Sequence, residues 1–129
     1  NIFYKFRFHN DYLKNNLNKK KISKKKSYVW FRLNEKKYLI FSIVNNKKII
    51  GLIIYNLKNS FYSILILKLY RSQSYGQTAL KKFISIIKSK KMKLYTLVKK
   101  KNQKSVHIHD KISSNKKDYN KNFFYYKIL

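Results

Sequence analysis

The chain has 129 residues, enough for about one domain, and carries 32 lysines and arginines against four acidic residues, a formal net charge of +28. Because 44% of its residues are hydrophobic and 17% are aromatic, it can bury a core, which excludes a wholly disordered basic tail. The chain has no cysteine, which excludes disulfides, cysteine-based zinc sites and cysteine nucleophiles.

The charge imbalance bears most directly on function. A free domain with this much positive charge repels itself and attracts polyanions. Phosphate backbone is the obvious polyanion, since each phosphate contact also releases condensed counterions. An anionic membrane surface is the alternative, but the lysines lie in short clusters between strand-like runs rather than on amphipathic helices. No apolar run approaches the roughly 18 residues of a spanning helix. The composition therefore predicts a nucleic-acid-binding protein with no membrane partner.

Residue usage bears on origin. The chain has no proline and two glycines, and it favours lysine, asparagine, isoleucine, tyrosine and phenylalanine. A+T-rich codons encode this set, so we infer an A+T-rich genome, plausibly an organellar one. The expected location is the mitochondrial matrix, with a plastid-type organelle as the alternative.

The first segment, residues 1–27, is polar and lysine-rich, with sparse apolar residues. It is either a solvated linker or a basic arm that becomes ordered on RNA. The net charge favours the arm. Its two lysine clusters are Lys19, Lys20, Lys21, Lys24, Lys25 and Lys26.

Residues 28–59 predict a β-hairpin extension. Residues 36–44 and 49–57 are rich in aromatic and β-branched side chains, as strands are. The intervening Asn45–Lys48 predicts a turn, because asparagine tolerates left-handed backbone angles. Residues 49–57 are almost continuously apolar, which predicts a strand covered on both faces.

Residues 60–129 predict a strand, a helix, a two-stranded hairpin and a final strand. The first strand is residues 61–71. The helix is residues 77–90, because Leu80, Phe83, Ile84 and Ile87 have the spacing of one buried helical face. Ser74 and Gln77 have the form of a capping box at its start.

The predicted hairpin pairs residues 92–98 with 105–112 around a basic tip, 99–104, and residues 119–129 form the last strand. His107 and His109 would then share one strand face without a third metal ligand, so we expect them to meet RNA or solvent rather than a metal. Paired carboxylates, a glycine-rich phosphate loop and an activated serine are not recognisable. The sequence predicts no enzyme, no cofactor and no small-molecule substrate.

Several segments resemble the S-ten family of small-subunit ribosomal proteins. Residues 63–71 resemble its first strand, 77–84 its helix, and 106–119 the stretch after its hairpin tip. The resemblance implies an α+β fold: a ferredoxin-like β-α-β-β unit with a long basic-tipped β-hairpin, here without the second helix and last strand.

The resemblance also implies a function: a structural constituent of an organellar ribosome, expected to be mitochondrial, in the head of the small subunit, with ribosomal RNA and neighbouring small-subunit proteins as partners. Three alternatives stay open. Gln77-Thr78-Ala79 is similar to the helix start of the S-eleven family, and Trp30-Phe31-Arg32 to a strand of the L-eighteen family. The third is a non-ribosomal RNA- or DNA-binding regulator. Beyond the arm lysines, the expected RNA contacts are Arg71, Lys99, Lys100, Lys101, Lys104, His107, His109, Lys116 and Lys117.

Overall fold

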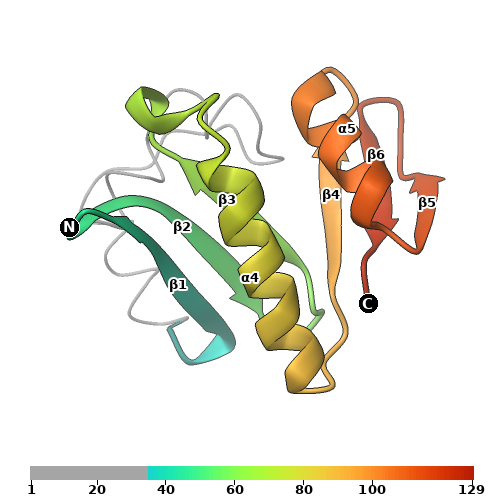
Figure 1. Ribbon diagram of the computed structural model, residues 1–129. Helices are drawn as coiled ribbons and strands as arrows, with labels where there is room; N and C mark the ends of the chain where they lie inside the picture. The colour runs from blue at the N-terminus through green and yellow to red at the C-terminus, as the bar shows by residue number, and fades with distance from the viewer. Residues whose placement is uncertain (1–34) are drawn as a thin grey trace.

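The computed structural model describes residues 35–129 (Figure 1), so the predicted basic arm and Trp30-Phe31-Arg32 lie outside the described residues. The described elements, in chain order, are η1 Glu35–Lys37, β1 Tyr38–Asn45, β2 Lys48–Asn56, β3 Tyr62–Ile66, η2 Lys68–Tyr70, α4 Tyr75–Ser89, β4 Tyr95–Lys99, α5 Gln103–Ile112, β5 Asn115–Asp118 and β6 Phe123–Lys127.

The predicted N-terminal hairpin is confirmed as β1 and β2. Asn46 and Lys47 form its tight turn, both with positive φ, as a two-residue hairpin turn requires. β2 is the central strand of a three-stranded antiparallel sheet ordered β1-β2-β3. Four consecutive β2 residues, from Ile50 to Ile53, are buried, which confirms the prediction that this strand is covered on both faces.

A second antiparallel sheet, ordered β4-β6-β5, follows in sequence. The two sheets meet where β3 and β4 begin. There the Tyr95 amide donates to the Ser60 carbonyl at 2.9 Å, and Thr96 Oγ1 donates to the Tyr62 carbonyl at 2.9 Å. The contact is a single parallel bridge, from Phe61 to Tyr95, after which β3 pairs only with β2 and β4 only with β6 among the described residues. Figure 1 shows the two strands diverging toward the end where both helices begin.

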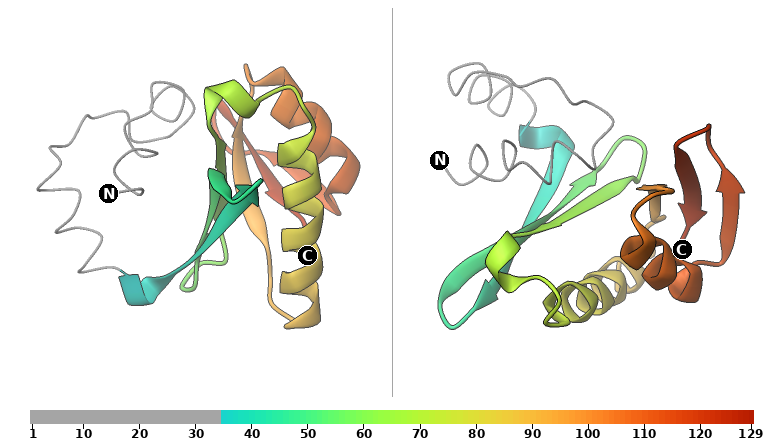
Figure 2. Two further views of the ribbon diagram at one scale, coloured as in Figure 1. Left: turned by 60° about the vertical axis from the view of Figure 1, so that its left-hand side comes forward. Right: turned by 90° about the horizontal axis from the view of Figure 1, so that it is seen from above.

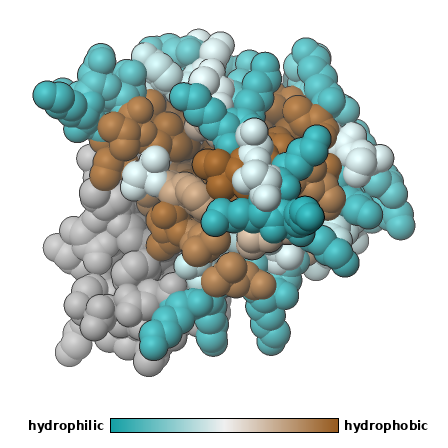
Figure 3. Space-filling view, turned by 60° about the horizontal axis from the view of Figure 1, so that its bottom comes forward, coloured by the Kyte–Doolittle hydropathy of each residue, from teal (hydrophilic) through white to brown (hydrophobic). Residues whose placement is uncertain are grey.

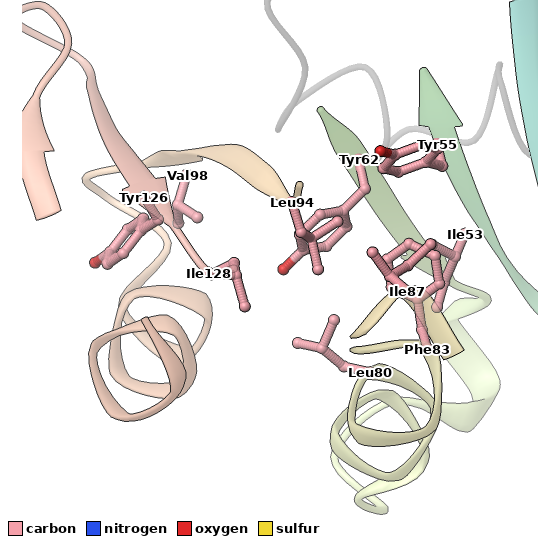
Figure 4. Close-up of a cluster of buried hydrophobic side chains, with 10 residues drawn as sticks. All are labelled: Ile53, Tyr55, Tyr62, Leu80, Phe83, Ile87, Leu94, Val98, Tyr126 and Ile128. Atoms are coloured by element: carbon pink, nitrogen blue, oxygen red, sulfur yellow. The ribbon is translucent and has the colours of Figure 1, made fainter. Parts of the chain in front are cut away.

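Both helices pack on the same side of the sheets, α4 over the first and α5 over the second (Figure 2). Leu80, Phe83 and Ile87 of α4 are buried, as predicted, while Ile84 is half-buried against the same core. Figure 4 shows Tyr62 and Leu94 lying between the α4 side of this core and the side chains of the second sheet. The core is therefore continuous across the junction, although the strand hydrogen bonding is not.

The ferredoxin-like interpretation is wrong, because the segment after α4 is not a long hairpin. Residues 105–112, predicted as a strand, belong to helix α5, and residues 99–104 do not project as a basic tip. The apolar alternation there is only two repeats long. The true pattern places Ser105, His109 and Ile112 on one helical face, and the Asn102 side chain caps the helix by accepting from the Ser105 amide at 3.3 Å. The strand β4 instead pairs with β6.

The strand predicted for residues 61–71 also ends early, at Ile66, and the chain turns through the short η2 helix before α4. Over residues 35–129, none of the helices has the length and apolar character needed to cross a bilayer.

A substitution at Gly51 can test how closely β2 packs against β3. A Cβ atom placed there would lie 2.5 Å from the Leu65 carbonyl oxygen on β3 and 2.8 Å from Ile66 Cδ1. Because the nearest atom is backbone, Gly51→Ala should lower the free energy of unfolding by about 1–3 kcal/mol in urea titrations.

The matched control is Gly76→Ala, at the start of α4, where the nearest atom to an added Cβ is an Ile66 side-chain carbon at 3.6 Å. This substitution should leave stability unchanged or raise it slightly. Equal losses for the two variants would contradict the close strand packing at Gly51.

Candidate functional site

A cleft of about 680 Å³ is lined by β3, the turn before α4, the start of α4, and α5. Its size lies in the range of small-molecule sites. Side chains of β3, α4 and α5 form the apolar part of its wall: Ile64, Leu65, Ile66, Leu80 and Ile108. Residues of the turn before α4 and of the first half of α5 form the polar part: Tyr70, Arg71, Ser72, Ser74, Tyr75, Gly76, Gln77, Asn102, Lys104, Ser105, His107 and His109.

The turn that leads into α4 has the backbone of an anion site. Ser72 and Ser74 both adopt positive φ, at 61° and 65°, which is uncommon for a residue with a side chain. Such conformations cost free energy and concentrate at functional sites. The Ser74 side chain makes no capping hydrogen bond, while the Ser74 carbonyl accepts from the Thr78 amide at 3.1 Å. The amides of the first turn therefore face the cleft end of α4 without a side-chain cap, and they favour an anion there.

Positive side chains gather around the same turn. Lys104 Nζ, on α5, donates to Ser72 Oγ at 2.7 Å, which joins the start of α5 to the turn before α4. Arg71 Nε donates to the Ile66 carbonyl at 2.8 Å, and partial burial lowers the pKa of its guanidinium, which still stays charged at neutral pH. Among the described residues that line the cleft, none is acidic. The polar part of the cleft thus has the potential of an anion-binding site.

His109 is the buried titratable side chain of the cleft wall, at 3% exposure. Its Nδ1 lies 2.7 Å from the Ser105 carbonyl oxygen, so Nδ1 carries the proton and donates it. Nε2 then accepts from the Tyr62 hydroxyl at 2.6 Å. Burial lowers the pKa of His109, while the Ser105 carbonyl and Asp110 oppose that shift. Burial also raises the pKa of Tyr62, so both groups are neutral at pH 7.

The carboxylates near α5 are already paired. Asp110 accepts from the Tyr126 hydroxyl at 2.6 Å and forms an ion pair with Lys116 at 2.9 Å, and these contacts lower the pKa of its carboxyl. Asp118 pairs with Lys100 at 3.0 Å. Within residues 35–129, no three histidine or acidic side chains gather as a metal site.

The structure divides the residues that the sequence predicted as RNA contacts. It brings four of them to the cleft wall: Arg71, Lys104, His107 and His109. The others in the described range lie elsewhere, with Lys99 at the end of β4, Lys100 and Lys101 in the next turn, and Lys116 and Lys117 on the exposed strand β5. His107 is exposed and His109 buried, so the two do not share a face as predicted for a strand. Contact between any of these side chains and RNA stays a prediction.

The turn cannot be recognised from a glycine pattern. Ser72 and Ser74 adopt the left-handed conformations that glycine ordinarily supplies in phosphate-binding loops. The Ser74 and Gln77 pair, interpreted as a capping box, is not one, since Ser74 has positive φ and caps nothing. The available signal was a basic residue, Arg71, followed by the polar residues Ser72, Gln73 and Ser74 just before the clearest helix.

The described residues thus form two antiparallel sheets joined through one short parallel contact, with a cleft beside an uncapped helix start, and not a ferredoxin-like unit. The model of the acetyltransferase (GNAT) family matches residues 6–113. The chain therefore belongs to this acetyltransferase family. A search of curated proteins finds no match.

Solved structures share the fold. A domain from Methanocaldococcus jannaschii DSM 2661 has a TM-score of 0.82 at 14% identity, over 98% of this chain and 89% of that one. A chimera of the spermidine N-acetyltransferase SpeG from Vibrio cholerae and hSSAT has a TM-score of 0.77 at 14% identity, over 99% and 87%. The N-acetyltransferase PseH of Campylobacter jejuni, in complex with acetyl coenzyme A, has a TM-score of 0.66 at 16% identity, over 80% and 77%.

These findings overturn the functional prediction from sequence. The S-ten resemblance is wrong, as are the S-eleven and L-eighteen alternatives, because the family is that of acetyltransferases and the fold is theirs. The predictions of a ribosomal constituent with ribosomal RNA as partner, of no enzyme and of no small-molecule substrate are wrong for the same reason. The mitochondrial location stays a prediction from residue usage.

The buried histidine makes folding sensitive to pH. Because the folded state lowers the pKa of His109 below the usual value of 6.5, the unfolded chain takes up that proton first as the pH falls. Its contribution to stability is complete above about pH 6.5 and is lost as the pH falls toward the lower folded pKa. Urea unfolding of the wild type should therefore show a decline between about pH 7 and 5 that His109→Gln reduces.

His107→Gln is the matched control, because His107 lies two residues earlier on the same helix and is exposed. This variant should keep the wild-type decline. If His107→Gln flattens the profile and His109→Gln does not, the assignment of the neutral buried imidazole to His109 is wrong.

Proposed function

We propose that this protein transfers an acetyl group from acetyl coenzyme A to an amine. The single observation that carries the proposal is the cleft lined by β3, the start of α4 and α5, where an uncapped helix start and two cationic side chains meet an apolar wall. Membership of the acetyltransferase family and the acetyl coenzyme A bound to a protein of the same fold support it.

The polar and apolar parts of the cleft match two parts of acetyl coenzyme A. Coenzyme A carries a diphosphate, which suits the first-turn amides of α4 together with Arg71 and Lys104. Its pantetheine arm is a thin chain with two amides, which suits the apolar walls and the exposed strand edge of β3. Because β3 and β4 stop pairing after their first residues, the backbone of β3 beyond that bridge has no partner from β4. A pantetheine amide can pair with such an edge as a strand would.

The reaction forms one bond, breaks one bond and moves one proton. The neutral amine nitrogen attacks the thioester carbonyl carbon, a C–N bond forms, the C–S bond breaks, and the nitrogen loses one proton while the sulfur gains one. His109 lines the buried part of the cleft wall, and its Nε2 accepts from the Tyr62 hydroxyl at 2.6 Å. Because this imidazole is the buried titratable group of the cleft wall, we assign His109, with Tyr62 as its hydrogen-bond partner, to proton transfer during the reaction.

The donor site is tested by binding. The full chain should bind acetyl coenzyme A, measured by titration calorimetry, and S-acetylpantetheine, which has no phosphate, should bind more weakly. Lys104→Met should weaken binding of acetyl coenzyme A about fivefold, the range of one exposed charge pair, and leave S-acetylpantetheine unchanged.

Lys101→Met is the control for loss of one positive charge. Lys101 is exposed, lies three residues before Lys104 and does not line the cleft. Lys101→Met should leave the affinities for acetyl coenzyme A and for S-acetylpantetheine nearly unchanged. Equal affinity of the wild type for both thioesters would rule out a phosphate site at the turn, and no binding of acetyl coenzyme A would rule out the proposed function.

Proton transfer is tested by kinetics at saturating acetyl coenzyme A. His109→Gln should lower kcat by about 10²–10⁴-fold, the usual contribution of a positioned acid or base, with a much smaller change in KM for the donor. A drop in donor affinity with kcat preserved would show that His109 only shapes the cleft wall.

A further inference from the structure

We infer that the acceptor is the α-amino group of an acidic polypeptide segment, rather than a polyamine or a lysine side chain. This inference rests on the proposed acetyl transfer and names the substrate class of that same site. Two independent observations carry it: the charge of the molecule and the lack of a strong base among the described residues that line the cleft.

The first observation concerns charge. An acceptor that carries several ammonium groups, such as spermidine, needs carboxylates to hold them. The whole chain has four acidic residues, and two of these, Asp110 and Asp118, are paired with Lys116 and Lys100 at 2.9 Å and 3.0 Å. None of the acidic residues in the described range lines the cleft. The remaining two are Asp11, outside the described residues, and Glu35, at the start of η1.

The surface has the same character as the composition. Figure 3 shows hydrophilic side chains surrounding the apolar area on one face of the molecule, and the charged residues of the described range are overwhelmingly lysines. A field of this sign slows the encounter with a polycation and speeds the encounter with a polyanion. A protein of closely similar fold is named as a spermidine acetyltransferase chimera, so the fold alone does not impose a preference for anionic acceptors. In this chain the preference comes from the net charge.

The second observation concerns protons. An amine attacks only when it is neutral, and near pH 7.5 about a third of α-amino groups are neutral against about one in a thousand lysine ammonium groups. Deprotonating a lysine or a polyamine therefore needs a base of high pKa. The described residues of the cleft offer no carboxylate, and burial lowers the pKa of His109, which already accepts from Tyr62. The site favours an amine that is partly neutral without help.

Together the two observations select an α-amino group on an anionic chain. Exocyclic amines of nucleic acid bases are poor nucleophiles because their lone pairs are delocalised into the ring, so an acidic polypeptide is the anionic acceptor with a reactive amine.

The experiment measures kcat/KM for acetyl transfer by the full chain at saturating acetyl coenzyme A, so that the charge of the donor does not contribute. Four synthetic acceptors are compared. The first is a ten-residue peptide with a free N-terminus followed by aspartates and glutamates, and the second has lysines at the same positions. The third is the acidic peptide with a blocked N-terminus and one internal lysine, and the fourth is spermidine.

The expected result is at least about tenfold higher kcat/KM for the acidic free-N-terminus peptide than for the other three, with the advantage over the lysine peptide shrinking as salt rises from about 0.05 to 0.5 M. The inference is overturned by equal or faster transfer to spermidine, to the lysine peptide or to the blocked peptide, or by a preference that salt does not change. Binding of acetyl coenzyme A without transfer to any of the four overturns it too and leaves the donor site standing. Failure to bind acetyl coenzyme A is instead a failure of the proposed function.

Discussion

The short parallel contact between β3 and β4 is the constraint on which the site depends. The Tyr95 amide and the Thr96 hydroxyl hold the second sheet to the first at one end only. The buried cluster that includes Tyr62, Leu94 and Ile128 keeps the two halves packed below that point. Right-handed twist separates the strands beyond it, and no ladder hydrogen bonds restrain them. The two sheets are therefore joined at one end only, and the cleft lies toward the end where no strand hydrogen bonds join them.

Both helices begin at the free end, and this places their N-termini at the same opening. The turn before α4 supplies backbone amides, and the first turn of α5 supplies Lys104, which reaches Ser72 across the cleft. The positive ends of both helix dipoles and the positive side chains therefore lie at the same opening of the cleft, and their electrostatic potentials add. Two serines held with positive φ cost free energy that the packed strand and helix on either side must offset. Such a cost is understandable where the backbone, not a side chain, contacts the ligand.

Much of the local structure could be predicted from the sequence. The hairpin around Asn46 and Lys47, the burial of β2 and the apolar face of α4 follow from turn chemistry and from periodicity over long segments. Helix α5 could not be recognised in the same way, since its ten residues include two histidines and only three large apolar side chains, which fit a strand alternation equally well. The pairing of β4 with β6 joins strands that are not adjacent in sequence, and local patterns carry no information on such a pairing. The resemblance to a ribosomal family failed because it depended on that α5 segment being a strand.

The ambiguity between helix and strand in the α5 segment also prevented recognition of the cleft from the sequence. Arg71, Lys104, His107 and His109 were predicted as separate contacts along an RNA surface, and the structure places all four in the wall of one cleft. Only the pairing of β4 with β6 and the helical turn of α5 bring Lys104 within 2.7 Å of Ser72 and separate His107 from the buried His109.

The net charge is the feature whose meaning changes most once the fold is known. A charge of +28 indicates a polyanionic partner, and RNA is the polyanion that a composition alone brings forward. In the proposed acetyl transfer, the same electrostatic field would act on two smaller anions, the phosphates of the donor and the acidic segment that we infer to carry the acceptor amine. The composition indicates the sign of a partner's charge but not the size of the partner, because the field far from the surface depends on the sum of the charges and not on their arrangement. The arrangement of the charges distinguishes a cleft from a flat basic surface, and here the cleft wall concentrates Arg71, Lys104 and the α4 amides around one turn. The composition alone could therefore indicate an anionic partner, and only the fold could show a cleft of small-molecule size.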